Sequence, residues 1–88
     1  MFAVNQPLNN INYNYDRDHD VLYLYIGKQS LSYADEPYPG IYIKYSDDTD
    51  KLTGAVIIDY KKRDINLLSN VLPIDIDFSN INTDISVN

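Results

Sequence analysis

The chain of 88 residues contains no cysteine, no tryptophan and only three glycines. Without cysteine it can form no disulfide bond, no thiolate nucleophile and no cysteine metal site. Its glycines, Gly27, Gly40 and Gly54, are too scattered to cradle a phosphate, and neither a G-x-G-x-x-G motif nor a P-loop occurs. We therefore expect no nucleotide chemistry and no thiol-based catalysis.

Positive charge and long apolar runs are also scarce. Seven Lys and Arg residues face 13 Asp and Glu residues, which gives a formal net charge of −6. This charge repels phosphate backbones and anionic membrane surfaces, so we expect no nucleic-acid partner and no membrane partner. No segment approaches the roughly 20 apolar residues of a membrane span, and residues 1–10 lack the regions of a signal peptide. The prediction is a cytoplasmic protein.

Tyrosine is the abundant aromatic residue, with nine copies against two of phenylalanine. Tyrosine must therefore supply most of the aromatic packing, and each ring brings a hydroxyl group that needs water or a partner. The hydrophobic share of 44% and the charged share of 23% are close to those of globular domains. We predict a single domain over residues 1–88, with its core in about residues 11–72 and a polar tail at 79–88.

Apolar residues in the first two thirds of the chain alternate with polar ones at the two-residue period of half-buried strands. Acidic segments and the Pro39-Gly40 pair interrupt this alternation and predict turns. The predicted strands are residues 11–15, 21–26, 31–34, 41–46 and 52–59, of which 31–34 is a weak edge strand. The pattern indicates one antiparallel sheet of about four or five short strands.

The period changes after residue 61, where Ile65, Leu68 and Leu72 occupy one face of a predicted helix. Asp59 or Asp64 is its candidate N-cap, and Pro73 should end it. The predicted fold class is therefore α+β, with a small antiparallel sheet and a C-terminal helix packed on one face.

Beyond Pro73, Ile74, Ile76 and Phe78 alternate with two aspartates, which predicts an extended segment laid against the domain or a neighbour. Residues 79–88 are polar with scattered Ile and Val, so we expect them to fray.

Several short motifs resemble a family of small bacterial and phage proteins that is catalogued as domain of unknown function twenty-two eighty-three. The matching residues are Tyr15-Asp16, Asp20, Leu22-Tyr23-Leu24, Pro39-Gly40-Ile41, and Gly54 leading into a strand closed by Asp59. The resemblance covers about residues 11–63. It implies a compact antiparallel sheet with a packed helix, carries no established reaction, and adds a suspicion of pairing with small toxins.

One position departs from that family. The strand that usually reads Gly-Ile-Glu-Ile-Leu-Asp in the family reads Gly54-Ala55-Val56-Ile57-Ile58-Asp59 here. Val56 cannot replace a carboxylate, so a family site that depends on this glutamate does not carry over.

The segment Asp16-Arg17-Asp18-His19-Asp20 has the D-x-D-x-D start of a calcium loop. The rest of the loop fails, because Val21 stands where a glycine is needed and Gly27 where a bidentate glutamate is needed. His19 is the only histidine, and no nucleophile is marked for it to activate. We therefore predict no metal site, no cofactor and no catalytic residue, and favour a solvated turn.

A second acidic cluster lies at Asp47, Asp48 and Asp50. It would assist the first cluster in weak cation binding only if the two turns lay at the same end of the sheet. The favoured interpretation is an ordinary polar hairpin turn.

The tyrosines indicate a possible binding surface. If Leu22 and Leu24 face the helix, strict alternation puts Tyr23 and Tyr25 on the opposite face, with Tyr42 and Lys44 beside them. On the strand over residues 52–59, either Ile57 or the pair Val56 and Ile58 must point the same way. The candidate partner-binding residues are Tyr23, Tyr25, Tyr42 and Ile57. The cover for this face is the segment 74–78, a second copy of the chain, or another protein.

The leading hypothesis is a non-enzymatic protein-interaction module, antitoxin-like in the sense of an acidic protein that masks a basic partner, or a self-associating homodimer. The alternative is a small metal-dependent enzyme or hydrolase that uses Asp16, Asp18, His19 and Asp20.

Overall fold

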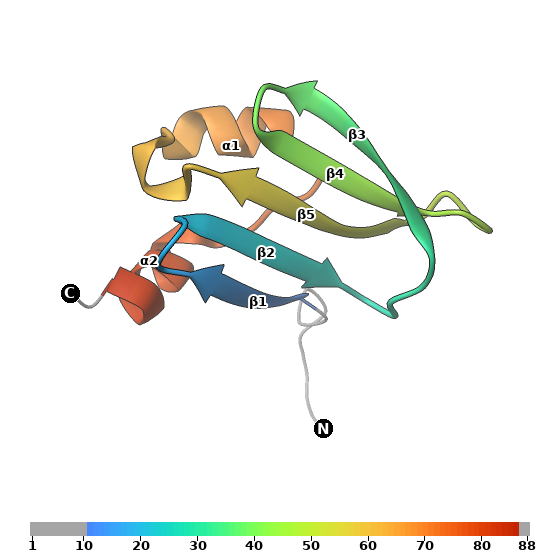
Figure 1. The fold of residues 1–88 in the computed structure, drawn as a ribbon, viewed down its shortest axis with the longest axis horizontal. Coiled ribbons are helices and arrows are strands. Elements are labelled where there is room, and N and C mark those ends of the chain that lie inside the picture. The colour runs from blue at the N-terminus through green and yellow to red at the C-terminus, as the bar shows by residue number, and fades with distance from the viewer. Residues whose placement is uncertain (1–10, 87–88) are drawn as a thin grey trace.

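Five antiparallel strands form a single sheet in the order β1-β2-β5-β4-β3. The computed structural model describes residues 11–86 (Figure 1). The strands are β1 (Ile11–Asp16), β2 (Val21–Ile26), β3 (Ser32–Tyr38), β4 (Ile41–Ser46) and β5 (Leu52–Ile58). A 3₁₀ helix (Tyr60–Lys62), α1 (Ile65–Val71) and α2 (Phe78–Ser86) follow. The predicted α+β class with a helix-covered antiparallel sheet is confirmed.

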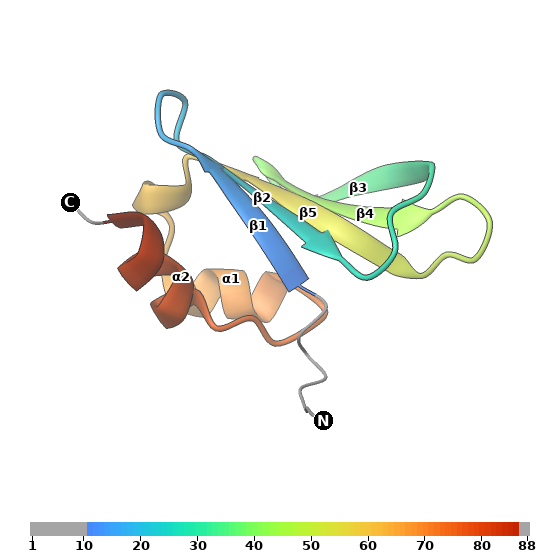
Figure 2. The ribbon, with the colours of Figure 1, turned by 90° about the horizontal axis from the view of Figure 1, so that it is seen from below.

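The last strand, β5, is inserted between β2 and β4, so the chain crosses the sheet between β2 and β3 (Figure 1). Both helices lie against the same face of the sheet, as the view from below shows (Figure 2). Of the residues that the structure describes, none forms a helix long and apolar enough to cross a membrane.

The core forms where the alternating apolar residues of the central strands meet the helices. Leu22 pairs with Ile57, Leu24 with Ala55, and Ile41 with Ile57, so these side chains share the helix-covered face. The buried apolar residues are Leu22, Leu24, Ile41, Ile43, Ala55, Ile57, Tyr60, Leu68, Leu72, Phe78, Ile81 and Ile85.

Helix α1 begins after Asp64, whose carboxylate accepts a hydrogen bond from the backbone N–H of Asn66 at 3.1 Å. Asp64 is therefore the N-cap of the two candidates, and Asp59 instead adopts a left-handed turn with φ 58°. Leu68 is fully buried, whereas Ile65 remains 40% exposed. Of the predicted apolar stripe, Leu68 and Leu72 make the contact with the sheet.

Helix α2 corrects two predictions about the C-terminal part. Phe78, Ile81 and Ile85 lie on one helical face and are buried, so the expected fraying is wrong over 79–85 and the core extends past residue 72. Asp77 accepts a hydrogen bond from the N–H of Asn80 at 3.0 Å, which supplies an acceptor to the first turn. Residues 1–10 and 87–88, the latter being the end of the predicted tail, lie outside the described residues.

The link between the helices is also different from the prediction. Residues 74–77 belong to no strand, and Phe78 already begins α2. Ile76 packs against the core on the helix side. The segment therefore cannot cover the second face of the sheet, because it belongs to the layer that covers the first.

Strand β3 is longer than the predicted 31–34 and includes Pro37. Its register with β4 shifts between Asp35 and Tyr38, and the strand lies at an edge of the sheet. Proline is tolerated here because an edge strand leaves one row of backbone donors without a ladder partner.

Gly54 in β5 is required by the close approach of β2. A Cβ atom at this position would meet the backbone carbonyl oxygen of Leu24. We expect Gly54→Ala to lower the free energy of unfolding by about 1–3 kcal/mol, because the backbone atom cannot move aside as a side chain can. Urea denaturation measures this loss.

Gly27→Asn is the matched control, since Gly27 has φ 65° but no atom within 4 Å of an added Cβ. Asparagine adopts this backbone conformation more readily than other residues, so we expect a loss below about 1 kcal/mol. A Gly54→Ala variant as stable as the wild type would contradict the proposed strand spacing.

Candidate functional site

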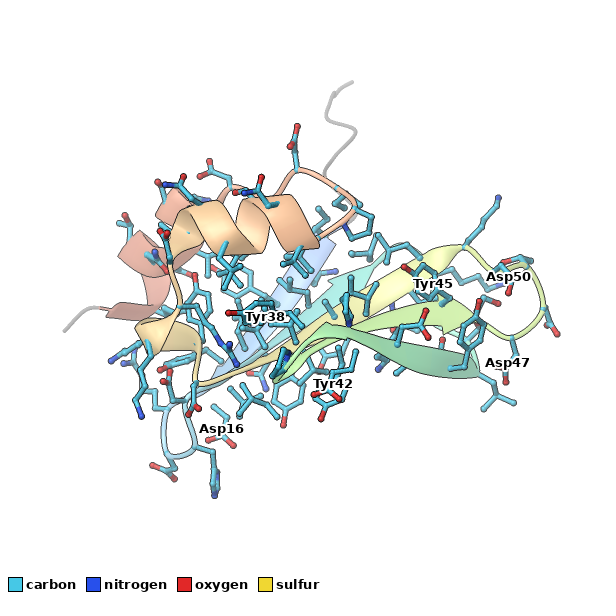
Figure 3. All side chains as sticks on the ribbon, turned by 90° about the horizontal axis from the view of Figure 1, so that it is seen from above. Asp16, Tyr38, Tyr42, Tyr45, Asp47 and Asp50 are labelled. Carbon is cyan, nitrogen blue, oxygen red and sulfur yellow. The ribbon has the colours of Figure 1, made fainter. Side chains whose placement is uncertain are left out.

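The face of the sheet opposite the helices, here called the open face, carries the tyrosines that the alternation predicted. Tyr23 and Tyr42 both pair with Val56, and Asn14 pairs with Tyr23, so one row crosses four strands. Figure 3 shows Tyr42 on the side of the sheet away from the helices. No helix of the described part of the chain covers this face (Figure 2).

A second row on the open face contains Asn12, Tyr25, Gly54 and Lys44, which are paired in that order across β1, β2, β5 and β4. The side chains of Tyr23, Tyr25 and Tyr42 are half-buried. The open face therefore combines tyrosine rings with the positive charge of Lys44.

One predicted site residue lies on the helix-covered face instead of the open face. Ile57 is 0% exposed and lies in the core between Leu22 and Ile41. The prediction that Ile57 lies on the partner-binding surface is therefore wrong, and the alternative pair Val56 and Ile58 faces that side. Their positions follow from the two-residue period, which puts neighbours of a buried residue on the opposite face.

The tyrosine hydroxyl groups differ in whether they have a hydrogen-bond acceptor within the protein. Four of them, none on the open face, donate to an acceptor within the protein. The pairs are Tyr13 to Asp84, Tyr15 to Asp20, Tyr33 to Asp50 and Tyr60 to Asn82. Within residues 11–86, no such partner is found for the hydroxyl groups of Tyr23, Tyr25 and Tyr42 on the open face, nor for those of Tyr38 and Tyr45 on the helix side. They remain available to water or to a binding partner.

The turn between β1 and β2 uses its acidic residues to hold its own backbone. Asp16 accepts hydrogen bonds from the backbone N–H groups of Asp18 and His19 at 3.1 and 3.3 Å, and its second oxygen contacts His19 Nδ1 at 2.9 Å. The hydrogen bond with His19 lowers the pKa of Asp16 below its ordinary value. This is the arrangement of a polar turn that satisfies its backbone locally.

Asp20 joins this turn to the segment that follows β5. It adopts φ 56°, and its carboxylate accepts the hydroxyl of Tyr15 at 2.6 Å and the backbone N–H of Lys61 at 3.1 Å. Its carbonyl oxygen accepts the N–H of Tyr60 at 3.0 Å. Among the residues described, no group of three His, Cys, Asp or Glu side chains is placed to hold a metal ion.

The two acidic turns lie at opposite ends of the sheet. Val21 pairs with Ile58, so the turn before β2 adjoins the end of β5, whereas the turn over residues 47–51 precedes its start. Figure 3 shows Asp16 at one end and Asp47 and Asp50 at the other. The condition for a cation site shared by both turns is therefore not met.

Sequence reasoning missed a groove of about 350 Å³ between β1 and the link that leads into α2. Its lining residues are Ile11, Tyr13, Asp75, Ile76, Asp77, Asn80 and Ile81. The available signal was the i, i+3, i+7 spacing of Phe78, Ile81 and Ile85, which predicts an amphipathic helix but not its position beneath β1.

Comparison with known proteins found no matching family model, no similar curated protein and no similar solved structure. The resemblance to domain of unknown function twenty-two eighty-three therefore stays a prediction, and the site is interpreted from its own geometry.

Two tyrosines of the covered side predict a stability loss at alkaline pH. Burial raises the pKa of Tyr15 and of Tyr60 from 10.0 to about 12, and the Asp20 carboxylate adds to both shifts. Since the folded state holds these protons more tightly, their contribution is complete below the unfolded pKa of 10.0 and is lost as pH rises to about 12.

We expect the free energy of unfolding, measured in urea, to fall steeply over this window. Tyr15→Phe and Tyr60→Phe should each make the free energy of unfolding depend less steeply on pH, and the double variant should show the weakest dependence. Identical slopes in all four proteins would contradict the assignment.

Proposed function

We propose that this protein is a non-enzymatic interaction module that binds a basic protein partner through the open face. The observation that carries the proposal is the set of three tyrosines, Tyr23, Tyr25 and Tyr42, on a sheet face that no described helix covers. Tyrosine supplies a large apolar surface together with a hydroxyl group, and it is enriched among the residues that dominate binding energy.

Charge supports a basic partner. The net charge is −6, and acidic turns flank the open face at both ends, with Asp16 to Asp20 at one end and Asp47 to Asp50 at the other. A field of one sign steers an oppositely charged protein into encounter and disfavours partners of like charge. The protein is in this sense antitoxin-like, since an acidic surface would mask a basic one.

A second copy of the chain is a less favourable occupant of the same surface. Two copies would each bring a charge of −6, and the acidic turns at both ends of each sheet would lie near those of the other. The hydrogen bonds within the turn also favour binding over catalysis, because Asp16 and Asp20 already serve as acceptors for the protein's own groups.

The test compares two double variants of exposed or half-exposed tyrosines. Tyr23→Ala/Tyr25→Ala removes two rings of the open face, whereas Tyr33→Ala/Tyr38→Ala removes two rings of β3 that are 42% and 39% exposed and leaves the open-face rings in place. A partner is first captured from the native cell with the wild-type chain and purified. Its dissociation constant is then measured by calorimetry with each protein.

We expect the open-face variant to weaken binding at least about tenfold, because each buried tyrosine anchor contributes more than about 1 kcal/mol. The β3 variant should bind as tightly as the wild type does. Added salt should weaken the binding of both the wild type and the β3 variant. Equal affinity of all three proteins would remove the open face from consideration. If the wild-type chain sediments as a homodimer even on dilution and binds no other protein, the partner of the open face is a second copy of the chain.

A further inference from the structure

The outer side of β1 is a free strand edge within the described residues. β1 pairs only with β2, and no backbone hydrogen bond from Ile11–Asp16 reaches any other element of the described chain. A strand edge presents a row of N–H and C=O groups that can pair with another extended segment.

The two edges of the sheet are not equivalent. β3 contains Pro37, carries Asp35 and Glu36, and shifts its register, which are features that discourage the approach of a further strand. β1 keeps an unbroken register with β2 over its six residues and has neither proline nor charge before Asp16. Of the two, only β1 is suited to accept an added strand.

The groove of about 350 Å³ lies directly below this edge. Its apolar walls are formed by Ile11, Ile76 and Ile81, and Asp75 and Asp77 contribute carboxylates. Both aspartates are exposed, and Asp77 already accepts the N–H of Asn80. Apolar walls with carboxylates fit a lysine or arginine side chain, which buries its stem and keeps its charge beside an acid.

We propose that the β1 edge and this groove bind an extended segment of the basic partner, in which Lys or Arg alternates with apolar residues. Successive side chains of a strand point to opposite faces, so the basic side chains enter the groove while the apolar ones continue the open face beside Asn12 and Asn14. The inference rests on the proposed function and specifies how the partner is recognised.

The charges near the groove disfavour a second copy of β1 as the strand that pairs with this edge. Antiparallel pairing of two β1 strands would bring Asp75 and Asp77, beside Ile11 of one copy, toward the Asp16 end of β1 in the other. Like charges across such a contact oppose association, whereas a basic strand neutralises them.

The experiment uses the full chain and a capped hexapeptide of alternating Lys and Ile. Hydrogen exchange is followed by NMR with and without the peptide. On saturation, the outward-facing amides of β1 should exchange at least about tenfold more slowly, because they gain strand partners. The matched peptide of alternating Glu and Ile should leave β1 unchanged, and equal protection by it would overturn the charge argument.

Asp75→Lys tests the groove, with Asp48→Lys as its control. Both substitutions change the net charge equally at exposed positions, but Asp48 lies in the turn between β4 and β5, which β2 separates from the β1 edge. We expect Asp75→Lys to weaken peptide binding about fivefold and Asp48→Lys to weaken it less than about twofold. An equal loss of peptide affinity in the two variants would mean that Asp75 acts only through its long-range charge, and it would overturn the proposed contact.

The failure of this inference is distinguishable from the failure of the proposed function. Peptide-induced changes of NMR chemical shift that are confined to Tyr23, Tyr25 and Tyr42 would overturn edge pairing and leave the open face as the binding surface. Absence of shifts at both β1 and the open face would overturn the inference, and wild-type affinity of the Tyr23→Ala/Tyr25→Ala variant for the native partner would overturn the proposed function. Protection of β1 by self-association without peptide would assign the edge to a second copy.

Discussion

The arrangement of this protein depends on one row of three buried side chains in the middle of the sheet. Ile57 lies between Leu22 and Ile41, and all three are fully shielded from solvent. Because the side-chain period of a strand is two, burying this row determines the face of every neighbouring residue. The same contact that builds the core therefore places Tyr23, Tyr42 and Val56 on the open face.

Alternation predicted the strands well where one face is wet and the other dry. β2 and β4 begin and end where the pattern changes, and β1 extends one residue past it. Two elements were less visible for physical reasons. β3 has little apolar content because it lies at an edge, so its pairing follows from β4, and α2 has only three apolar anchors in a polar segment, so its helix depends on the sheet it packs against.

The binding surface was predictable only in part. The alternation of leucine and tyrosine in β2 placed Tyr23 and Tyr25, but residues 55–58 of β5 are all apolar and contain no alternation to decide which of them faces the core. Pairing of β5 with β2 and β4 decides it in favour of Ile57. Hydroxyl pairing was also hidden, since the partners Asp84 and Asn82 come from a helix far along the chain.

The edge and the open face are two parts of one continuous surface. Asn12 and Asn14 of β1 begin the two rows that continue through Tyr25 and Tyr23, so a strand added to β1 would extend both rows by one residue. Backbone pairing at an edge depends little on sequence, which makes it a source of affinity without selectivity. Selectivity must then come from what borders the edge, namely Asn12 and Asn14 on the open face and the carboxylates of Asp75 and Asp77 on the helix side. In the proposed interaction, both features would favour the same partner, a basic strand with apolar residues between its charges.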